Sequence, residues 1–172
     1  MDVVFRVDRL SEATAVDLLN LLARHNQRYI LANPRFPLLY DSGVIYRRET
    51  VELWSDAPSA LRAGHEDCDA LAAWRAGELR ARGAAALRAG DPGFEQATRA
   101  RLRTIESEVM MTTRAKPGES GMYHCIVRYR VGAGWFRDDP SARLGMYAGQ
   151  VDAKILERWR RAGVAARAPL EV

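Results

Sequence analysis

The order of hydrophobic patterns along the chain limits its fold more than any other feature. Apolar residues recur at helical spacing in residues 11–31 and 68–82. Strand patterns rich in β-branched and aromatic residues follow in 105–113 and 122–131, and a glycine-rich turn at 132–134 leads into a third strand. Helices that precede an antiparallel sheet predict an α+β fold.

Helix boundaries follow from capping and breaking residues. Ser11 suits the N-cap of a helix that extends to about Leu31, and Asn33-Pro34 ends it. Ser55 is expected to cap a short helix through Ala63. Other expected elements are helices at 94–102 and 152–162 and a turn or loop at 116–121.

The connection that follows the first helix is long and unusually apolar. Residues 34–53 contain two prolines and Gly43 together with large side chains such as Phe36 and Tyr40. We expect this segment to pack down on the domain, and such long loops are often functional.

Length and composition bound the class of protein. The 172 residues, 48% of them hydrophobic, predict one domain over 1–172 with its own core. No apolar run approaches the roughly 20 residues of a membrane span, and the first residues lack a signal-peptide pattern. The two cysteines form no disulfide framework, which favours a reducing, cytoplasmic location.

The charge pattern argues against nucleic-acid binding. The net charge is +4, and the basic residues are nearly all arginines. They are scattered among Glu and Asp instead of forming one basic face, apart from a short cluster at 158–161. We therefore interpret them as a solvated surface.

The chain offers one candidate nucleophile. Cys68 lies at the start of the second long helical pattern, after the break at Gly64. A helix N-terminus favours a thiolate, and a thiolate is the reactive form of cysteine. The alanines and Gly77 predict that this helix packs closely against other elements at the centre of the fold. Arg75 interrupts its apolar stripe, and the sequence pattern does not explain why.

A base and an orienting acid follow in chain order. His124 lies in the second strand and Asp139 just after the third, and the turn at 132–134 pairs these strands. Cys68 as nucleophile, His124 as base and Asp139 as the group that orients His124 would suit acyl transfer. The backbone N–H of Cys68 could bind the oxyanion, and Trp54 and His65 are candidates for a second donor.

Structural and metal-binding interpretations compete with this triad. A cysteine in an alanine-rich helix and a histidine in a strand are commonly core residues. Zinc is a second alternative, with Cys68, Cys125, His65 and His124 as ligands. The spacing lacks a paired Cys-x-x-Cys unit, and strand alternation turns Cys125 away from His124 and into the core. We therefore expect no metal.

Three motifs in order resemble the transglutaminase-like superfamily, a branch of papain-like cysteine enzymes. Residues 64–72, with the sequence GHEDCDALA, resemble its G-D-C-D-D-L-A nucleophile motif. Residues 123–127 resemble its histidine strand, and 135–141, WFRDDPS, its strand that ends in D-P-[ST]. The apolar segment 34–46 and the Leu-Gly-Met at 144–146 resemble those of small phage and prophage members.

The resemblance covers about residues 54–146 and implies both a fold and an activity. The fold is transglutaminase-like, with the Cys68 helix packed on an antiparallel sheet. The activity is hydrolysis or amide transfer on a protein or peptide through a thioester, with Cys68, His124 and Asp139 as catalytic residues and no cofactor. Phage structural proteins would be partners and a virion-associated location an alternative to the cytoplasm. A non-catalytic phage assembly or interaction protein is the alternative function.

Overall fold

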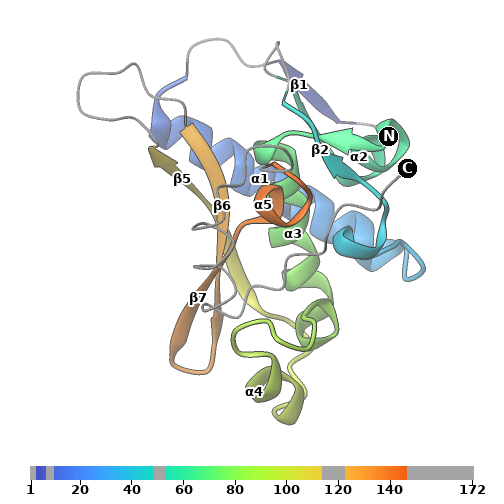
Figure 1. Ribbon diagram of the computed structural model, residues 1–172, viewed down its shortest axis with the longest axis vertical. Helices are drawn as coiled ribbons and strands as arrows, with labels where there is room; N and C mark the ends of the chain where they lie inside the picture. Colours follow the sequence, from blue (N-terminus) through green and yellow to red (C-terminus); the bar gives the residue numbers. More distant parts are fainter. Residues whose placement is uncertain (1–2, 7–9, 49–52, 114–122, 147–172) are drawn as a thin grey trace.

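The computed structural model describes residues 3–6, 10–48, 53–113 and 123–146 (Figure 1). The helix expected at 152–162 and the loop expected at 116–121 lie outside these ranges. No helix within the ranges has the length and apolar character needed to cross a membrane. In chain order the elements are β1 (Val4–Arg6), α1 (Glu12–Ala32), η1 (Leu39–Asp41), β2 (Ile45–Tyr46), β3 (Leu53–Ser55), α2 (Ala57–Ala63), β4 (His65–Glu66), α3 (Cys68–Arg82), η2 (Gly83–Ala86), α4 (Phe94–Arg99), β5 (Glu106–Thr113), β6 (Tyr123–Val131), β7 (Gly134–Asp138) and α5 (Pro140–Arg143).

The expected antiparallel sheet is present, and its strand order is β5-β6-β7. Helix α3 contacts both α1 and the strands β5 and β6, so it is the central element of the fold (Figure 1). Alternate residues of β6 enter the core beneath it, and Cys125, Val127, Tyr129 and Val131 are all buried. The prediction of an α+β fold is confirmed, with the helix that begins at Cys68 packed on the sheet.

Helix α1 begins and ends where its capping residues predict. The Ser11 side chain accepts a hydrogen bond from the backbone N–H of Thr14, and Asn33 is the C-cap. Gly77 of α3 allows α1 to approach closely, because a Cβ atom there would lie 2.7 Å from the carbonyl oxygen of Ala23. A side chain at this position would therefore push the two helices apart.

The expected N-cap of α2 is wrong by one residue. Asp56, not Ser55, caps α2, and its carboxylate accepts from the backbone N–H of Ser59. Ser55 instead ends β3 and donates its hydroxyl to Glu66, next to the start of α3. A carboxylate and a hydroxyl are comparable N-caps, so the choice between adjacent residues depended on a tertiary contact. Gly64 ends α2 with a positive φ of 73°, as the break in the pattern predicted.

The apolar connection after α1 packs down as expected. Leu39 is fully buried, and Phe36 lies against the ring of Trp74 from α3 with a centroid distance of 5.3 Å. Parallel pairing of β2 with β4 then places this connection beside the residues that lead into α3. Among the described residues of this connection, Ile45 is a large apolar side chain that is exposed, at 58%.

Arg75 lies buried at the centre of an ionic cluster, which explains the interruption in the apolar stripe. Its guanidinium donates to Asp138 Oδ2 at 2.8 Å, Glu78 Oε2 at 3.2 Å and Asp91 Oδ2 at 3.5 Å. Arg143 completes the cluster by donating to Asp91 and Asp138. A buried cation must be paired to be tolerated, and here the pairing ties α3 to the end of β7.

Candidate functional site

His124 and Asp139 are hydrogen-bonded to each other, as the hairpin topology predicts. The last residue of β7, Asp138, pairs with Val127 of β6, so Asp139 leaves the sheet near His124. The distance from His124 Nε2 to Asp139 Oδ2 is 2.8 Å, and the histidine is only 3% exposed. Asp139 also caps α5, because its other carboxylate oxygen accepts from the Ala142 backbone N–H.

Cys68 is the first residue of α3, at the positive end of the helix dipole. Asp67 is the N-cap and accepts from the backbone N–H of Asp69. Since Nε2 of His124 is held by Asp139, Nδ1 is the ring nitrogen left for the cysteine. This Nδ1 is buried and has no hydrogen-bond partner among the described residues, so the Cys68 approach is looser than a closed hydrogen bond.

The surroundings of Cys68 favour its thiolate. A hydrogen bond from the Cys125 thiol is the largest influence on the pKa of Cys68, burial opposes it, and His124 adds to it. The net effect lowers the pKa of Cys68 to about 5. The charged form is therefore the dominant one at neutral pH.

The surroundings of His124 favour its imidazolium. Burial alone would lower the pKa of His124, but the hydrogen bond to Asp139 and the neighbouring Cys68 sulfur outweigh burial. The net effect raises the pKa to about 9. Between these two pKa values, the favoured charge states are a thiolate at Cys68 and an imidazolium at His124.

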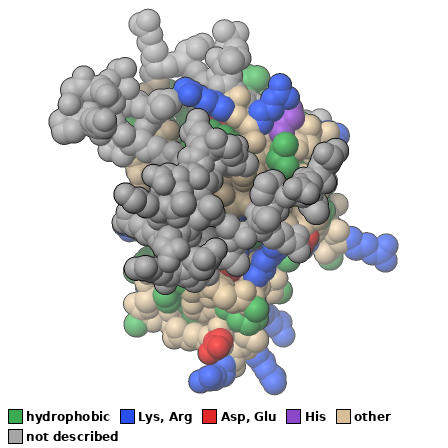
Figure 2. Space-filling model, viewed as in Figure 1, with side chains coloured by type: hydrophobic (Ala, Val, Ile, Leu, Met, Phe, Trp, Pro, Cys, Tyr) green, Lys and Arg blue, Asp and Glu red, His purple; other side chains and the backbone are tan. Residues whose placement is uncertain are grey.

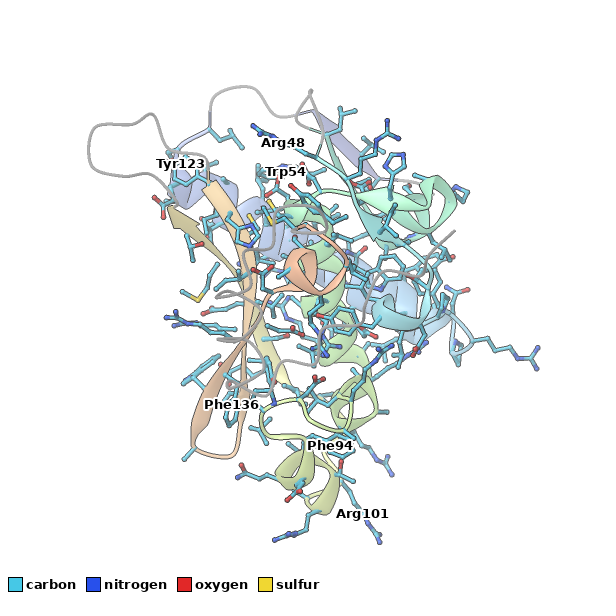
Figure 3. The ribbon with its side chains drawn as sticks, viewed as in Figure 1. Arg48, Trp54, Phe94, Arg101, Tyr123 and Phe136 are labelled. Carbon is cyan, nitrogen blue, oxygen red and sulfur yellow. The ribbon has the colours of Figure 1, made fainter. Side chains whose placement is uncertain are left out.

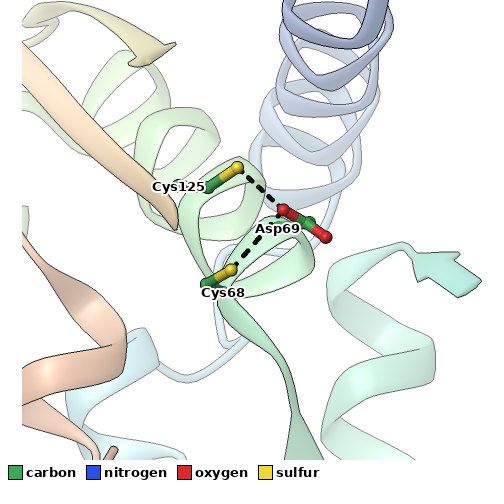
Figure 4. A group of neighbouring side chains, drawn as sticks. All are labelled: Cys68, Asp69 and Cys125. Carbon is green, nitrogen blue, oxygen red and sulfur yellow. Dashed lines mark hydrogen bonds between the residues drawn. The ribbon is translucent and has the colours of Figure 1, made fainter. Parts of the chain in front are cut away.

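Cys125 is a neighbour of Cys68 that the sequence did not reveal. As expected, Cys125 is a core residue with no exposed surface. Its sulfur nevertheless contacts Asp69 Oδ1 at 2.7 Å, and Cys68 Sγ lies 3.6 Å from the same oxygen (Figure 4). Strand alternation was a valid reason to expect burial, but it could not show that α3 starts directly over this position of β6.

The four zinc ligands that the sequence offered do not form one group among the described residues. Cys68 and Cys125 do come together, but their third neighbour is Asp69, and the ligand atoms of these three residues lie within 4.8 Å of one another. His65 lies elsewhere, with its Nε2 3.2 Å from Arg47. Because an arginine side chain can only donate hydrogen bonds, Nε2 of His65 must be the acceptor. The buried Nδ1–H of His65 has no hydrogen-bond partner among the described residues.

A surface groove lies away from Cys68, His124 and Asp139. Its volume is about 730 Å³, and it lies between α4 and β7, where Asp91, Phe94 and Phe136 contribute to its lining. Figure 3 shows Phe94 and Phe136 toward one end of the molecule and Trp54 and Tyr123 toward the other. Cys68, His124 and Asp139 do not line this groove, so its size carries no argument about acyl transfer.

Basic side chains do not gather on the described part of the face seen in Figure 2. The arginine side chains that it colours lie at separate points on this face. Several arginines pair with acids, including Arg128 with Glu108 and Arg130 with Glu106. These observations agree with the interpretation of a solvated surface.

Comparison of the chain with protein-family models, with curated protein sequences and with solved structures found no match.

Proposed function

We propose that the protein is a cysteine-dependent acyl-transfer enzyme, with Cys68 as nucleophile, His124 as acid and base, and Asp139 as the group that orients His124. The observation that carries the proposal is the 2.8 Å contact from His124 Nε2 to Asp139, which leaves Nδ1 buried and available for Cys68. The low pKa of Cys68 and the high pKa of His124 support the same assignment.

The reaction would follow from this charge arrangement. The Cys68 thiolate adds to the carbonyl carbon of an amide, and the carbonyl electron pair moves onto oxygen, next to the Cys68 backbone N–H. The imidazolium of His124 gives its Nδ1 proton to the departing amine, and a thioester remains. His124, now neutral, takes a proton from water or an amine that attacks the thioester, and the Cys68 thiolate leaves.

The substrate class follows from the chemistry and from the motif resemblance. We favour a peptidase or amidase acting on a protein or peptide over a crosslinking transglutaminase, with a transglutaminase-like fold and no cofactor. A phage structural protein and a cytoplasmic or virion-associated location remain part of this proposal. The three motifs of the resemblance contain the three residues of the triad.

The alternative, a non-catalytic assembly protein, assigned a docking role to the apolar segment 34–46. Most of that segment's large side chains pack inward, including the buried Leu39, while Ile45 is exposed. The activated state of Cys68 is also unnecessary for docking. Both observations favour the enzyme.

Thiol labelling tests the proposal directly. Iodoacetamide at about pH 6 should alkylate Cys68 rapidly and leave the buried Cys125 unmodified, because an ordinary thiol with a pKa of about 8.5 is mostly protonated there. His124→Ala should slow the labelling, since it removes the imidazolium. Cys68→Ala should abolish hydrolysis of a denatured protein such as casein and incorporation of a fluorescent amine. Equal, slow labelling of both cysteines at this pH would overturn the proposal.

A further inference from the structure

The two cysteines of the chain are 57 residues apart in the sequence, and the fold brings them close together. Cys68 starts α3, Cys125 belongs to β6, and both sulfurs contact Asp69 Oδ1, at 3.6 Å and 2.7 Å. The two sulfurs and this oxygen all lie within 4.8 Å of one another (Figure 4). Acyl transfer needs only one of these sulfurs, so the second has no role in the proposed reaction.

The two thiols differ in access and in charge. Cys68 is partly exposed, whereas Cys125 is fully buried. Cys125 has one proton and two neighbouring acceptors, the Asp69 carboxylate and the Cys68 sulfur. Both contacts favour the protonated thiol of Cys125 over its thiolate. An oxidant that enters from solvent therefore meets Cys68 first, and meets it as a thiolate.

We propose that Cys68 and Cys125 form a peroxide-reactive dithiol, in which Cys125 converts oxidised Cys68 into a reversible disulfide. The proposal rests on the proposed function in one respect, because the sulfur that peroxide would attack is the proposed nucleophile. The substrate of this reaction is hydrogen peroxide or a small organic hydroperoxide. Its consequence is that oxidation stops the enzyme without destroying it.

The two steps balance in atoms and electrons. The Cys68 thiolate attacks one peroxide oxygen, the O–O bond breaks, and the departing hydroxide takes a proton to become water, which leaves Cys68 as a sulfenic acid. Asp69 Oδ1 then accepts the Cys125 proton, and the Cys125 sulfur attacks the Cys68 sulfur. The S–O bond breaks, and the hydroxide leaves as a second water with that proton. Two thiols are oxidised, and one peroxide is reduced.

The geometry permits the disulfide after a small movement. A disulfide needs the sulfurs about 2.05 Å apart and the Cβ atoms about 3.8 Å apart. The sulfurs start within 4.8 Å, and Cys68 lies in the first turn of α3. Rotation of the Cys68 side chain moves its sulfur, and any approach that the Cβ atoms need would come from movement of this first turn.

The experiment uses the full chain and needs no catalytic assay. The reduced protein is treated with an equal amount of hydrogen peroxide, and its free thiols and intact mass are measured. We expect the loss of both free thiols, a mass lower by two hydrogens, and a protease digest that contains the Cys68 peptide joined to the Cys125 peptide. Dithiothreitol should restore both thiols and the labelling of Cys68 by iodoacetamide.

Cys125→Ala is the informative variant, because it removes the second sulfur and retains Cys68. It also removes the hydrogen bond that most lowers the pKa of Cys68, so peroxide is applied in excess. Excess peroxide should drive its Cys68 to the sulfinic acid, a gain of two oxygen atoms, and dithiothreitol should not recover the thiol. The proposal is overturned if wild-type Cys68 also ends as sulfinic acid, or if the disulfide joins two chains. It is also overturned if a tightly held metal, released by a chelator, is what protects both thiols.

The outcomes separate this proposal from the proposed function. Disulfide formation without hydrolysis of any protein or amide substrate would contradict the proposed acyl-transfer function and support the peroxide-reactive dithiol. Cysteine-dependent hydrolysis that peroxide inhibits irreversibly would contradict the dithiol proposal and support the proposed acyl-transfer function.

Discussion

Replacing Arg75 by Met should strongly destabilise the protein, although Arg75 lies outside the proposed triad. Arg75 donates to three carboxylates and to the carbonyl oxygen of Ala86, at 2.7 Å, and it has no exposed surface. Breaking a buried ion pair by removing one partner typically costs about 3–5 kcal/mol, since the other charge is left in a low dielectric.

The structure indicates the lower part of that range. Without Arg75, the carboxylates of Asp91 and Asp138 would keep their contacts with Arg143, at 2.8 and 3.2 Å. Glu78 would keep only the Leu39 backbone N–H, at 3.2 Å, among the partners that the structure gives it. Arg143 alone would then face the two aspartates, and Glu78 would have no ion-pair partner among these contacts. We therefore expect a loss of about 3 kcal/mol in the free energy of unfolding.

The pH dependence of this loss identifies its source. Burial already raises the pKa of Glu78 in the wild-type protein, and Arg75 opposes that rise. In Arg75→Met the pKa should rise further, so the folded state binds a proton that the unfolded state releases. The loss of stability should therefore grow as the pH increases and shrink in acid.

Urea unfolding followed by circular dichroism measures the change. Arg130→Met is the matched control, because Arg130 is half exposed and its pairing with Glu106 should contribute less than about 1 kcal/mol. The double variant Arg75→Met/Glu78→Gln should recover part of the loss, since it removes the stranded charge. An Arg75→Met protein within about 1 kcal/mol of wild type at every pH would refute the reasoning.

Two further predictions concern the site and the packing beneath it. Asp139→Asn keeps an oxygen for the α5 cap but removes the charge, so the pKa of His124 should fall below about 9. The stability that wild type loses as the pH rises through about 9 should then be smaller in the variant, because only the Cys68 sulfur still raises the pKa of His124. NMR titration of the His124 ring measures the shift directly. Gly77→Ala should destabilise by about 1–3 kcal/mol despite the better helix propensity of alanine, because its Cβ would clash with α1. Thermal unfolding checks this, and a stabilised variant would contradict it.

Local signals in the sequence predicted most of the elements. The Ser11 cap, the break at Gly64 and the turn at 132–134 each depend on a few neighbouring residues, and the structure confirms all three. The pairing of His124 with Asp139 also followed from local information, since one hairpin brings them together. Such features need no knowledge of which elements pack against each other.

The missed features all depend on tertiary contacts. Cys125 was identified as a core residue, but its contact with Asp69 depends on where α3 crosses β6. The interrupting Arg75 was visible in the sequence, and a charge in a buried stripe should have prompted a search for acids such as Asp138. The N-cap of α2 was misplaced because Ser55 has a different partner, Glu66.

The separation of the triad along the chain has a consequence for the newly made protein. His124 and Asp139 are 15 residues apart within one hairpin, whereas Cys125, the neighbour of His124, is 56 residues from Asp69 at the start of α3. Short-range contacts form early in folding, and long-range contacts form later, because closing a longer loop costs more entropy. Until the hairpin docks on α3, Cys68 lacks the contacts that lower its pKa, so it behaves as an ordinary thiol. In the proposed enzyme, the Cys68 sulfur would therefore become reactive only when the sheet and the helix meet.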